Sequence, residues 1–164
     1  MAWACFSIDS RRFAATVAKT EPSLRARAMR FLARREHSRT ELQRKLSHVA
    51  AEGDDVEAVL DELAKQGWLS DARYAELAVR SKARRFGPLK VAHQLRAKGV
   101  GDETIAAAVR AAGEDGIANV EQVWRSRFSA APVNDRERAR QVRFLQGRGF
   151  ALDDILKFLR DRAR

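Results

Sequence analysis

The chain has 164 residues, of which 45% are hydrophobic and 33% are charged, proportions typical of a folded globular protein rather than a disordered one. No apolar run approaches the length of a membrane-spanning helix, so we expect no membrane association, and the single cysteine, Cys5, excludes an internal disulfide. The formal net charge of +10 favours a polyanionic partner, and an amino terminus without signal-peptide features predicts a cytoplasmic protein.

A repeated apolar pattern organises the sequence. Leu46, Leu95 and Leu145 lie 49 and then 50 residues apart, and each is followed at similar offsets by the apolar face of another helix. A fixed period of this size is typical of helical repeat proteins. We therefore predict an all-α protein of three tandem three-helix repeats of about 50 residues, which form an elongated, curved array. The predicted segments are an N-terminal arm over 1–20 and repeats over 21–67, 68–113 and 114–164.

The arm and the first repeat come first in the chain. The aromatic residues of 1–20 could dock on the first repeat, or the segment could be a disordered tail. Thr20 is a candidate N-cap for the first helix, with Pro22 in its first turn. Ser38 and Glu41 have the spacing of a reciprocal capping box for the second helix. The third helix is expected to begin at Asp54-Asp55 and to stop at Gly67.

The second and third repeats carry similar start and stop signals. Ser70 is expected to cap the first helix of the second repeat, which must end before Gly87-Pro88. Asp102 is expected to cap the third helix of that repeat. In the third repeat, Asn134 to Glu137 predicts another capping box, and Gln141 stands where the second repeat has an apolar Val91.

The basic residues follow the repeat. Of the 32 lysines and arginines, 23 lie in 25–45, 73–98 and 125–148, the stretches that hold the first two helices of each unit. The segment 52–62 instead contains six acidic residues and no basic one, and 102–121 contains five acidic residues against a single arginine. Three such units side by side would present a basic stripe backed by an acidic face. Alternatively, the charges simply cover the solvated sides of amphipathic helices, with some acids placed to complement helix dipoles.

A basic stripe of this kind would contact phosphates rather than base edges, so binding would be sequence-tolerant and sensitive to salt. An acidic protein surface would be an equally suitable partner. Phe86 and Trp68 lie near basic residues and could stack on bases, although a core position is the more natural expectation for Trp68. The candidate contact residues are Arg30, Arg34, Arg35, Arg39, Arg44, Lys45, Lys82, Arg84, Arg85, Lys90, Arg96, Lys98, Arg140, Arg143 and Arg148.

Nothing in the sequence predicts catalysis or a cofactor. There is no Gly-rich phosphate loop and no dinucleotide-binding fingerprint. The paired carboxylates Asp54-Asp55 and Asp153-Asp154 are best interpreted as helix caps. His37, His48 and His93 lack partners at metal-ligand spacing and are expected on solvated helix faces. We therefore expect a protein that acts by binding.

Several stretches resemble the bacterial RecX family of regulatory proteins. In the second repeat these are GWLSDARYA (67–75), FGPLKV (86–91) and QLRAKGV (94–100). FLARREHSRTEL (31–42) is similar to the first unit of that family, and RFLQGRGF (143–150) to its last. The resemblance extends from about Leu24 to Leu159, with one departure at 50–52, where Ala-Ala-Glu replaces the usual Lys-Gly-Phe turn.

This resemblance implies a fold and a function. RecX proteins are built from tandem three-helix units that bind in the groove of the RecA–DNA filament. They suppress ATP hydrolysis, strand exchange and co-protease activity, and they can also bind single- and double-stranded DNA. The resemblance thus implies a non-enzymatic modulator, mainly an inhibitor, of RecA in DNA repair, recombination and the SOS response. We expect it to act as a monomer. The alternatives are an independent DNA- or RNA-binding protein of helix-turn-helix type and a helical scaffold for an acidic protein.

Overall fold

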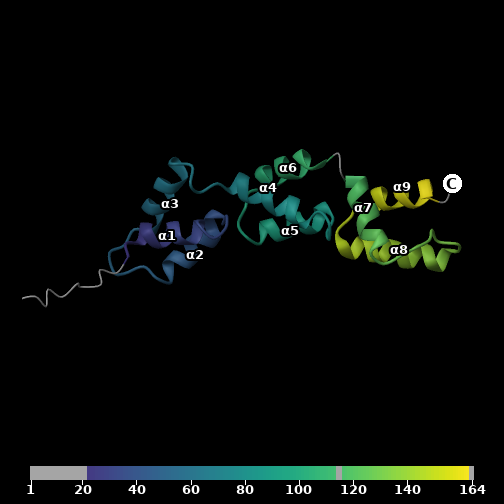
Figure 1. Cartoon of the computed structure of the whole chain (residues 1–164), viewed down its shortest axis with the longest axis horizontal. Coiled ribbons are helices and arrows are strands. Elements are labelled where there is room, and N and C mark those ends of the chain that lie inside the picture. The colour runs from purple at the N-terminus through teal and green to yellow at the C-terminus, as the bar shows by residue number, and fades with distance from the viewer. Residues whose placement is uncertain (1–21, 114–115, 163–164) are drawn as a thin grey trace, which may run out of the picture.

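The computed structural model describes residues 22–113 and 116–162, which form helices and connecting turns without a strand. The elements in chain order are α1 (Leu24–Leu32), α2 (Arg39–Ser47), α3 (Val56–Lys65), α4 (Asp71–Lys82), α5 (Pro88–Arg96), α6 (Asp102–Ala111), α7 (Gly116–Arg125), α8 (Asp135–Arg148) and α9 (Leu152–Arg162). They form three groups of three helices in an elongated row (Figure 1). The predicted all-α fold of three tandem units is therefore confirmed. The proposed arm over 1–20 and the candidate cap Thr20 lie outside the described residues.

Each group of three helices has its own apolar core. Leu42, Leu46 and Leu60 are fully buried in the first group, and Leu95 and Ile105 are almost fully buried in the second. In the third, Trp124 packs edge-on against Phe158 with their ring centroids 5.7 Å apart. The buried residues fall into three separate clusters, one in each group. A unit of this size buries little apolar surface by itself, so contacts with its neighbours matter for its stability.

Four helices begin at the predicted N-caps. In each case a side-chain oxygen accepts a hydrogen bond from the backbone N–H three residues later, which satisfies one of the free donors of the first turn. The four cap residues are Ser38, Asp55, Ser70 and Asn134.

Two other predicted starts are wrong. α1 begins at Leu24, capped by Ser23, and Pro22 lies before the cap, where its carbonyl accepts a hydrogen bond of 3.0 Å from Arg27. Asp102 is the first residue of α6 and not its cap. Its carboxylate accepts a hydrogen bond of 2.6 Å from Nε of Arg96, a charge-assisted bond that outcompetes a neutral amide donor.

Both predicted capping boxes also lack the return hydrogen bond, in which the glutamate carboxylate accepts from the backbone N–H of the cap residue, so this part of the prediction is wrong. Glu41 does not return to the backbone N–H of Ser38, because its carboxylate is paired with Arg35 at 2.5 Å. Glu137 accepts a hydrogen bond of 3.1 Å from the N–H of Val133, the residue before the cap. Both glutamates therefore bind a residue that precedes the helix, but they do not bind the N–H of the cap residue as in the standard motif.

Gln141, which interrupted the apolar repeat, is buried like its counterpart Val91. Its side-chain oxygen accepts a hydrogen bond of 2.7 Å from the indole N–H of Trp124, and its amide nitrogen donates to the carbonyl of Ala130 at 3.2 Å. A buried indole needs an acceptor. The polar residue is therefore explained by the tryptophan that faces it.

The second and third helices of the units lie on opposite long sides of the molecule. In Figure 1, α2, α5 and α8 follow one edge, while α3, α6 and α9 follow the other. Since the second helices hold many of the basic residues and α3 is rich in acids, this arrangement places the two signs of charge on different sides.

Candidate nucleic-acid interface

The second helices α2, α5 and α8 are joined end to end by contacts that repeat at both unit boundaries. At the first joint, where α1–α3 meet α4–α6, the hydroxyl of Ser38 donates to the carbonyl of Lys98 at 2.6 Å. At the second joint, where α4–α6 meet α7–α9, the N–H of Gly87 donates to the carbonyl of Arg148 at 2.9 Å. In both cases the N-terminal end of one helix meets the C-terminal end of the next, an orientation in which the helix dipoles attract.

Each joint contains a left-handed glycine at the end of the receiving helix. Gly99 has φ +76° and lies against the side chain of Thr40, while Gly149 has φ +92° and lies against Lys90. A side chain at either position would overlap these neighbours, so only glycine permits both the backbone conformation and the close approach. The N–H of Leu89 donates to the carbonyl of Gly149 at 3.1 Å, which completes the second joint.

Acidic residues neutralise the first joint. The carboxylate of Glu41 is almost fully buried, pairs with Arg35 at 2.5 Å and lies 3.7 Å from Nζ of Lys45. The hydrogen bond from Arg35 holds the pKa of Glu41 below its ordinary value, opposed by burial and assisted by the charges of Arg35, Lys98 and His37. A single carboxylate thus interacts with cations from both units.

Further polar contacts hold the two units together at the first joint. Arg73 of α4 pairs with Glu36 at 2.9 Å and also donates to the carbonyls of Gly67 and Trp68 in the connecting turn. The carboxylate of Asp71 accepts a hydrogen bond of 2.8 Å from the N–H of Arg39. The first joint is therefore closed by charge-assisted bonds as well as by the helix ends.

The second joint contains cations in place of these acids. Nζ of Lys90 lies 4.9 Å from the ring centroid of Phe86, and the guanidinium carbons of Arg85 and Arg148 lie 5.7 and 5.9 Å from it. Arg148 also lies over Phe144 at 5.2 Å. Such cation–π contacts fix the positions of the charges without neutralising them.

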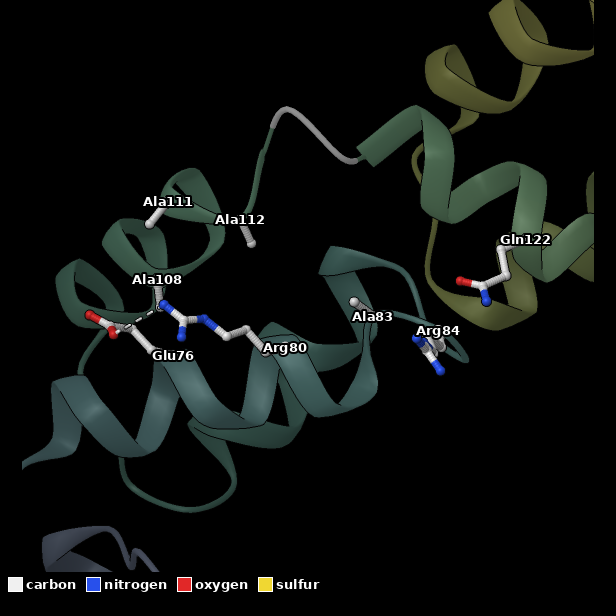
Figure 2. Close-up of a pocket in the computed structure, with 8 residues that line it drawn as sticks. All are labelled: Glu76, Arg80, Ala83, Arg84, Ala108, Ala111, Ala112 and Gln122. Atoms are coloured by element: carbon white, nitrogen blue, oxygen red, sulfur yellow. Dashed lines mark ion pairs between the residues drawn. The ribbon is translucent and has the colours of Figure 1, made fainter.

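A shallow groove of about 400 Å³ adjoins the second joint. Its walls are formed by α4, by the alanines at the C-terminal end of α6 and by Gln122 of α7 (Figure 2). Arg80 lies opposite Glu76 at 3.9 Å, whereas Arg84 lies beyond the end of α4, on the side of Gln122. The groove is open, and the residues that line it include no converging set of nucleophile, acid and base.

The fifteen predicted contact residues fall into two groups within the described part of the chain. Nine have a side-chain hydrogen bond, an ion pair or an aromatic contact that fixes their position: Arg35, Arg39, Lys45, Lys82, Arg85, Lys90, Arg96, Arg140 and Arg148. The other six have no such hydrogen bond, ion pair or aromatic contact among the described residues and are partly or fully exposed: Arg30, Arg34, Arg44, Arg84, Lys98 and Arg143.

Acidic partners reduce the separation of charge that the sequence predicted. Arg39 reaches across to Glu57 at 2.7 Å and Asp61 at 2.6 Å on α3, and Arg96 is paired with Asp102 at the start of α6. These arginines therefore belong to the boundary between the basic and acidic sides. The unpaired cations and the second joint carry the excess positive charge.

Two sequence expectations about side-chain burial are wrong. Trp68 is 53% exposed and not part of the core, because the turn after the positive-φ Gly67 directs the next buried position to Leu69. His37 is buried and not on a solvated face: its Nδ1 is 2.9 Å from the carbonyl of Arg35, and its Nε2 is 2.8 Å from Nζ of Lys45. Burial lowers the pKa of this imidazole.

Sequence reasoning also missed the residues that distinguish the two joints. Glu41 and Lys90 occupy equivalent positions, because each lies five residues before the repeated leucine, Leu46 or Leu95. Aligning the repeats by Leu46 and Leu95 would have shown an acid replaced by a base at this position. Within the described ranges, no cluster of histidine, cysteine or carboxylate side chains could hold a metal, and no helix has the length and apolarity needed to cross a membrane.

Comparison with family models gives matches in all three units. Residues 25–63 match the first three-helix domain of RecX, residues 70–109 the second and residues 114–159 the third. Together these matches cover most of the chain.

Curated relatives extend the similarity over the same region. The chain is 41% identical over 135 residues to the regulatory protein RecX of Herminiimonas arsenicoxydans, which covers 82% of this chain and 89% of that protein. It is 42% identical over 138 residues to the regulatory protein RecX of Leptothrix cholodnii, which covers 84% of this chain and 88% of the relative.

Solved structures share the fold. The crystal structure of RecX from Lactobacillus salivarius superposes with a TM-score of 0.71 at 21% identity and covers 85% of this chain and 94% of that one. A second crystal structure of a regulatory protein RecX gives a TM-score of 0.70 and covers 84% of this chain and 70% of the other.

Proposed function

The chain belongs to the RecX family, and on that basis we propose that it modulates the RecA recombinase, mainly as an inhibitor, by binding in the groove of the RecA–DNA filament. In this role it regulates DNA repair, recombination and the SOS response in the cytoplasm. It acts as a monomer and by binding rather than by catalysis.

One observation carries this proposal: α2, α5 and α8 are joined end to end along one side of an elongated molecule (Figure 1). Exposed cations without a hydrogen bond, ion pair or ring contact among the described residues occur in all three units: Arg34 and Arg44 in the first, Arg84 in the second and Arg143 in the third, with Arg44 on α2 and Arg143 on α8. A long basic edge of this kind matches a partner whose negative charge and binding sites recur along a filament axis.

Recurrent contacts would give strong binding without a single deep site. Each unit presents a small basic surface, and once one unit is bound the others act at high effective concentration. Contacts between arginines and phosphates carry no sequence information, so DNA in the filament would be bound irrespective of its sequence.

An independent DNA- or RNA-binding role of helix-turn-helix type is less well supported. A recognition helix places its N-terminal residues against base edges. Here the N-terminal ends of α2 and α5 are covered by the next unit, and the third-helix segment 52–62 of the first unit contains six acidic residues. Sequence-specific operator binding with no effect on RecA would nevertheless favour that role.

The direct test is DNA-dependent ATP hydrolysis by RecA, measured while this protein is titrated from substoichiometric to equimolar amounts. We expect hydrolysis to fall at substoichiometric ratios, because one bound molecule contacts several neighbouring RecA subunits. A variant with Arg34, Arg84 and Arg143 changed to glutamate should lose this effect at unchanged helix content. If the wild-type protein leaves the rate unchanged over the whole range, the proposal is wrong.

A further inference from the structure

The two joints share a backbone arrangement but differ in charge at one equivalent position. Aligning the repeats by Leu46 and Leu95 places Glu41 of the first joint at the position of Lys90 in the second. The same alignment places His37 opposite Phe86, so that each joint contains a ring next to this charged residue. The architecture is therefore repeated while the sign of the charge is reversed.

The first joint satisfies its charges internally. Glu41 is paired with Arg35, and Arg73 of α4 is paired with Glu36 of the preceding unit. The pKa of Glu41 is lowered in part by Lys98, which shows that a cation of the second unit also acts on this carboxylate. Both of these carboxylates are therefore engaged by cations, and the joint has ion pairs within the first unit and across the boundary.

The second joint does not satisfy its charges internally. Among the described residues, no ion pair links α4–α6 to α7–α9. Lys90, Arg85 and Arg148 all lie within about 6 Å of the centroid of one ring, that of Phe86, so no two of them can be more than about 12 Å apart. Three clustered cations without a counter-charge repel one another, a cost that an anion would relieve.

These cations come from both sides of the joint and are held in place. Lys90 belongs to α5, and its Nζ donates to the carbonyl of Gly147 in α8 at 3.2 Å. Arg148 lies over the rings of both Phe86 and Phe144, with its guanidinium carbon 5.9 and 5.2 Å from their centroids. A guanidinium stacked on aromatic faces keeps its N–H edge available for an in-plane acceptor.

We propose that Arg85, Lys90 and Arg148 form a binding site for the phosphodiester backbone of a nucleic acid, and that phosphates bound there hold the third unit against the second. The site deepens the proposed function, because it identifies the part of the basic side that contacts DNA in the filament. It also makes the second joint stiffer in the bound protein than in the free one.

The chemistry favours a nucleic-acid backbone over an acidic protein. A nucleic-acid strand carries one charge about every 3.4 Å, so neighbouring phosphates can meet several clustered cations without rearrangement. Carboxylates on a protein surface lose side-chain entropy when they are drawn together to the same density. The partly buried rings of Phe86 and Phe144 also lie beside the cations, where a base could stack.

Binding of a fluorescein-labelled oligothymidine to the full-length protein tests the site. Replacing Lys90 and Arg148 with glutamine (K90Q/R148Q) should raise Kd at least about tenfold at 0.1 M salt. It should also reduce the slope of log K against log salt concentration by about 1.4, because two phosphate contacts on a single strand are lost. The matched control K65Q/R110Q removes two exposed charges from α3 and α6 and should change Kd less than about threefold. Equal effects of the two double variants would overturn the site.

A second variant guards against misfolding. Arg85 is exposed and touches only the ring of Phe86 among the described residues, so R85Q should keep the wild-type circular dichroism. It should raise Kd about three- to tenfold. A Kd equal to that of the wild-type protein would remove Arg85 from the site and overturn the proposed three-residue arrangement.

Distance distributions between spin labels test the stiffening of the joint. In a Cys5→Ser background, labels at Glu103→Cys and Asp153→Cys span the second joint, and labels at Lys65→Cys and Glu103→Cys span the first. Adding oligothymidine should narrow the distance distribution across the second joint and leave the distribution across the first joint unchanged. Unchanged widths at both joints, with the oligonucleotide bound, would contradict the proposed clamp.

Two further measurements separate this inference from related ones. If oligothymidine binds through the second joint but ATP hydrolysis by RecA is unaffected, the phosphate site stands and the proposed function is wrong. If the protein inhibits RecA but K90Q/R148Q does not change DNA binding, the proposed function stands and the phosphate site is wrong. If polyglutamate binds with the same dependence on Lys90 and Arg148 while oligothymidine does not, the site takes carboxylates and the assignment to nucleic acid is wrong.

Discussion

At the scale of single residues, Glu41 has a role that its sequence context does not suggest. It lies near the start of an exposed-looking helix, yet its carboxylate is only 4% exposed and is surrounded by Arg35, Lys45 and His37. Removing a buried carboxylate leaves its cationic partners without compensation, which costs more than the original pair contributed. Glu41 therefore stabilises the first unit and its boundary with the second.

We expect Glu41→Gln to lower the free energy of unfolding by about 1–2 kcal/mol, a value reduced from that of a fully buried pair because Arg35 is half exposed. Urea denaturation monitored by circular dichroism measures the change. The matched control Glu57→Gln removes a 54% exposed partner of Arg39 and should cost less than about 0.5 kcal/mol. Equal losses for the two variants would show that burial of Glu41 contributes nothing.

The pH dependence of stability should reveal His37. Burial holds the pKa of its ring below the ordinary value, and the charges of Arg35 and Lys45 act in the same direction. Below its ordinary pKa of about 6.5, the ring therefore binds a proton more readily in the unfolded protein than in the folded protein. Stability is complete above about pH 6.5 and falls as the pH drops toward 5. His37→Gln should flatten this fall, whereas His93→Gln on the exposed face of α5 should retain it.

The lowered pKa of Glu41 predicts a second pH range, more acidic than that of His37, in which the stability of the protein changes. The folded carboxylate resists protonation, mainly because of its hydrogen bond with Arg35. Its contribution is present above the ordinary glutamate pKa of about 4.3 and is lost as the pH falls through the folded value. Unfolding curves of Glu41→Gln should therefore converge with those of the wild-type protein at acidic pH. A constant difference between the two proteins at every pH would contradict this assignment.

At the scale of elements, the boundaries between units are made by helix ends rather than by helix faces. The N-terminal ends of α2 and α5 each meet the C-terminal end of the next second helix, through Ser38 and Lys98 and through Gly87 and Arg148. Helix ends carry unpaired donors and acceptors, so this arrangement satisfies both ends at once. The left-handed glycines at these points are therefore part of the joints as well as stops.

Substitution at one of these glycines should separate the two roles. Gly149→Ala must adopt φ near +92° and would also overlap the backbone of Lys90, so we expect a loss of about 2–4 kcal/mol. Gly67→Ala has a similar φ of +75° but nothing within 4 Å, and should lose only about 1–2 kcal/mol. Thermal unfolding compares the two. A loss at Gly149 no larger than that at Gly67 would show that the joint does not depend on close approach.

At the scale of the whole molecule, charge and shape act together. The second helices run along one side and the third helices along the other (Figure 1). Several arginines at the boundary between these sides are paired with acids, so the excess positive charge lies on the unpaired residues and the second joint. A surface of this kind should bind polyanions by counterion release.

Reversing the charge of Arg84, Arg85, Lys90, Arg96 and Lys98 should weaken binding to the RecA filament or to DNA at unchanged helix content. Of these five, Arg96 is already paired with Asp102 and should contribute least. Single variants compared by fluorescence anisotropy at several salt concentrations should show this order, with a loss of about 0.7 in the salt slope for each phosphate contact on a single strand. Arg125→Glu, at a site paired with Glu121, is the control. If binding survives all five reversals, the central stripe is only a solvated surface.

Much of the fold was accessible from local patterns. The repeated spacing of Leu46, Leu95 and Leu145 predicted the three units, and the caps at Ser38, Asp55, Ser70 and Asn134 lie where the sequence placed them. Such signals are local, because a cap needs only its own first turn and a buried face needs only helical periodicity. The failures, Pro22 and Asp102, occur where a competing serine or arginine lies close by.

The candidate site was less accessible, because its decisive contacts join residues far apart in the chain. The sequence could list basic residues, but it could not show that Arg39 and Arg96 are neutralised by acids or that Lys90 and Arg148 meet at Phe86. Likewise, the burial of His37 and the exposure of Trp68 depend on how units pack and not on local pattern.

The sequence by itself determined that this protein is a basic, all-helical array of three units related to RecX, because period, caps and composition are properties of the chain alone. Only the tertiary structure decided which charges are compensated. Electrostatic pairing depends on distance in space, and the helix ends that meet at the two joints lie about 60 residues apart in sequence. At the first joint Glu41 thereby compensates part of the positive charge, whereas the second was left with three cations around Phe86 that have no ion-pair partner among the described residues.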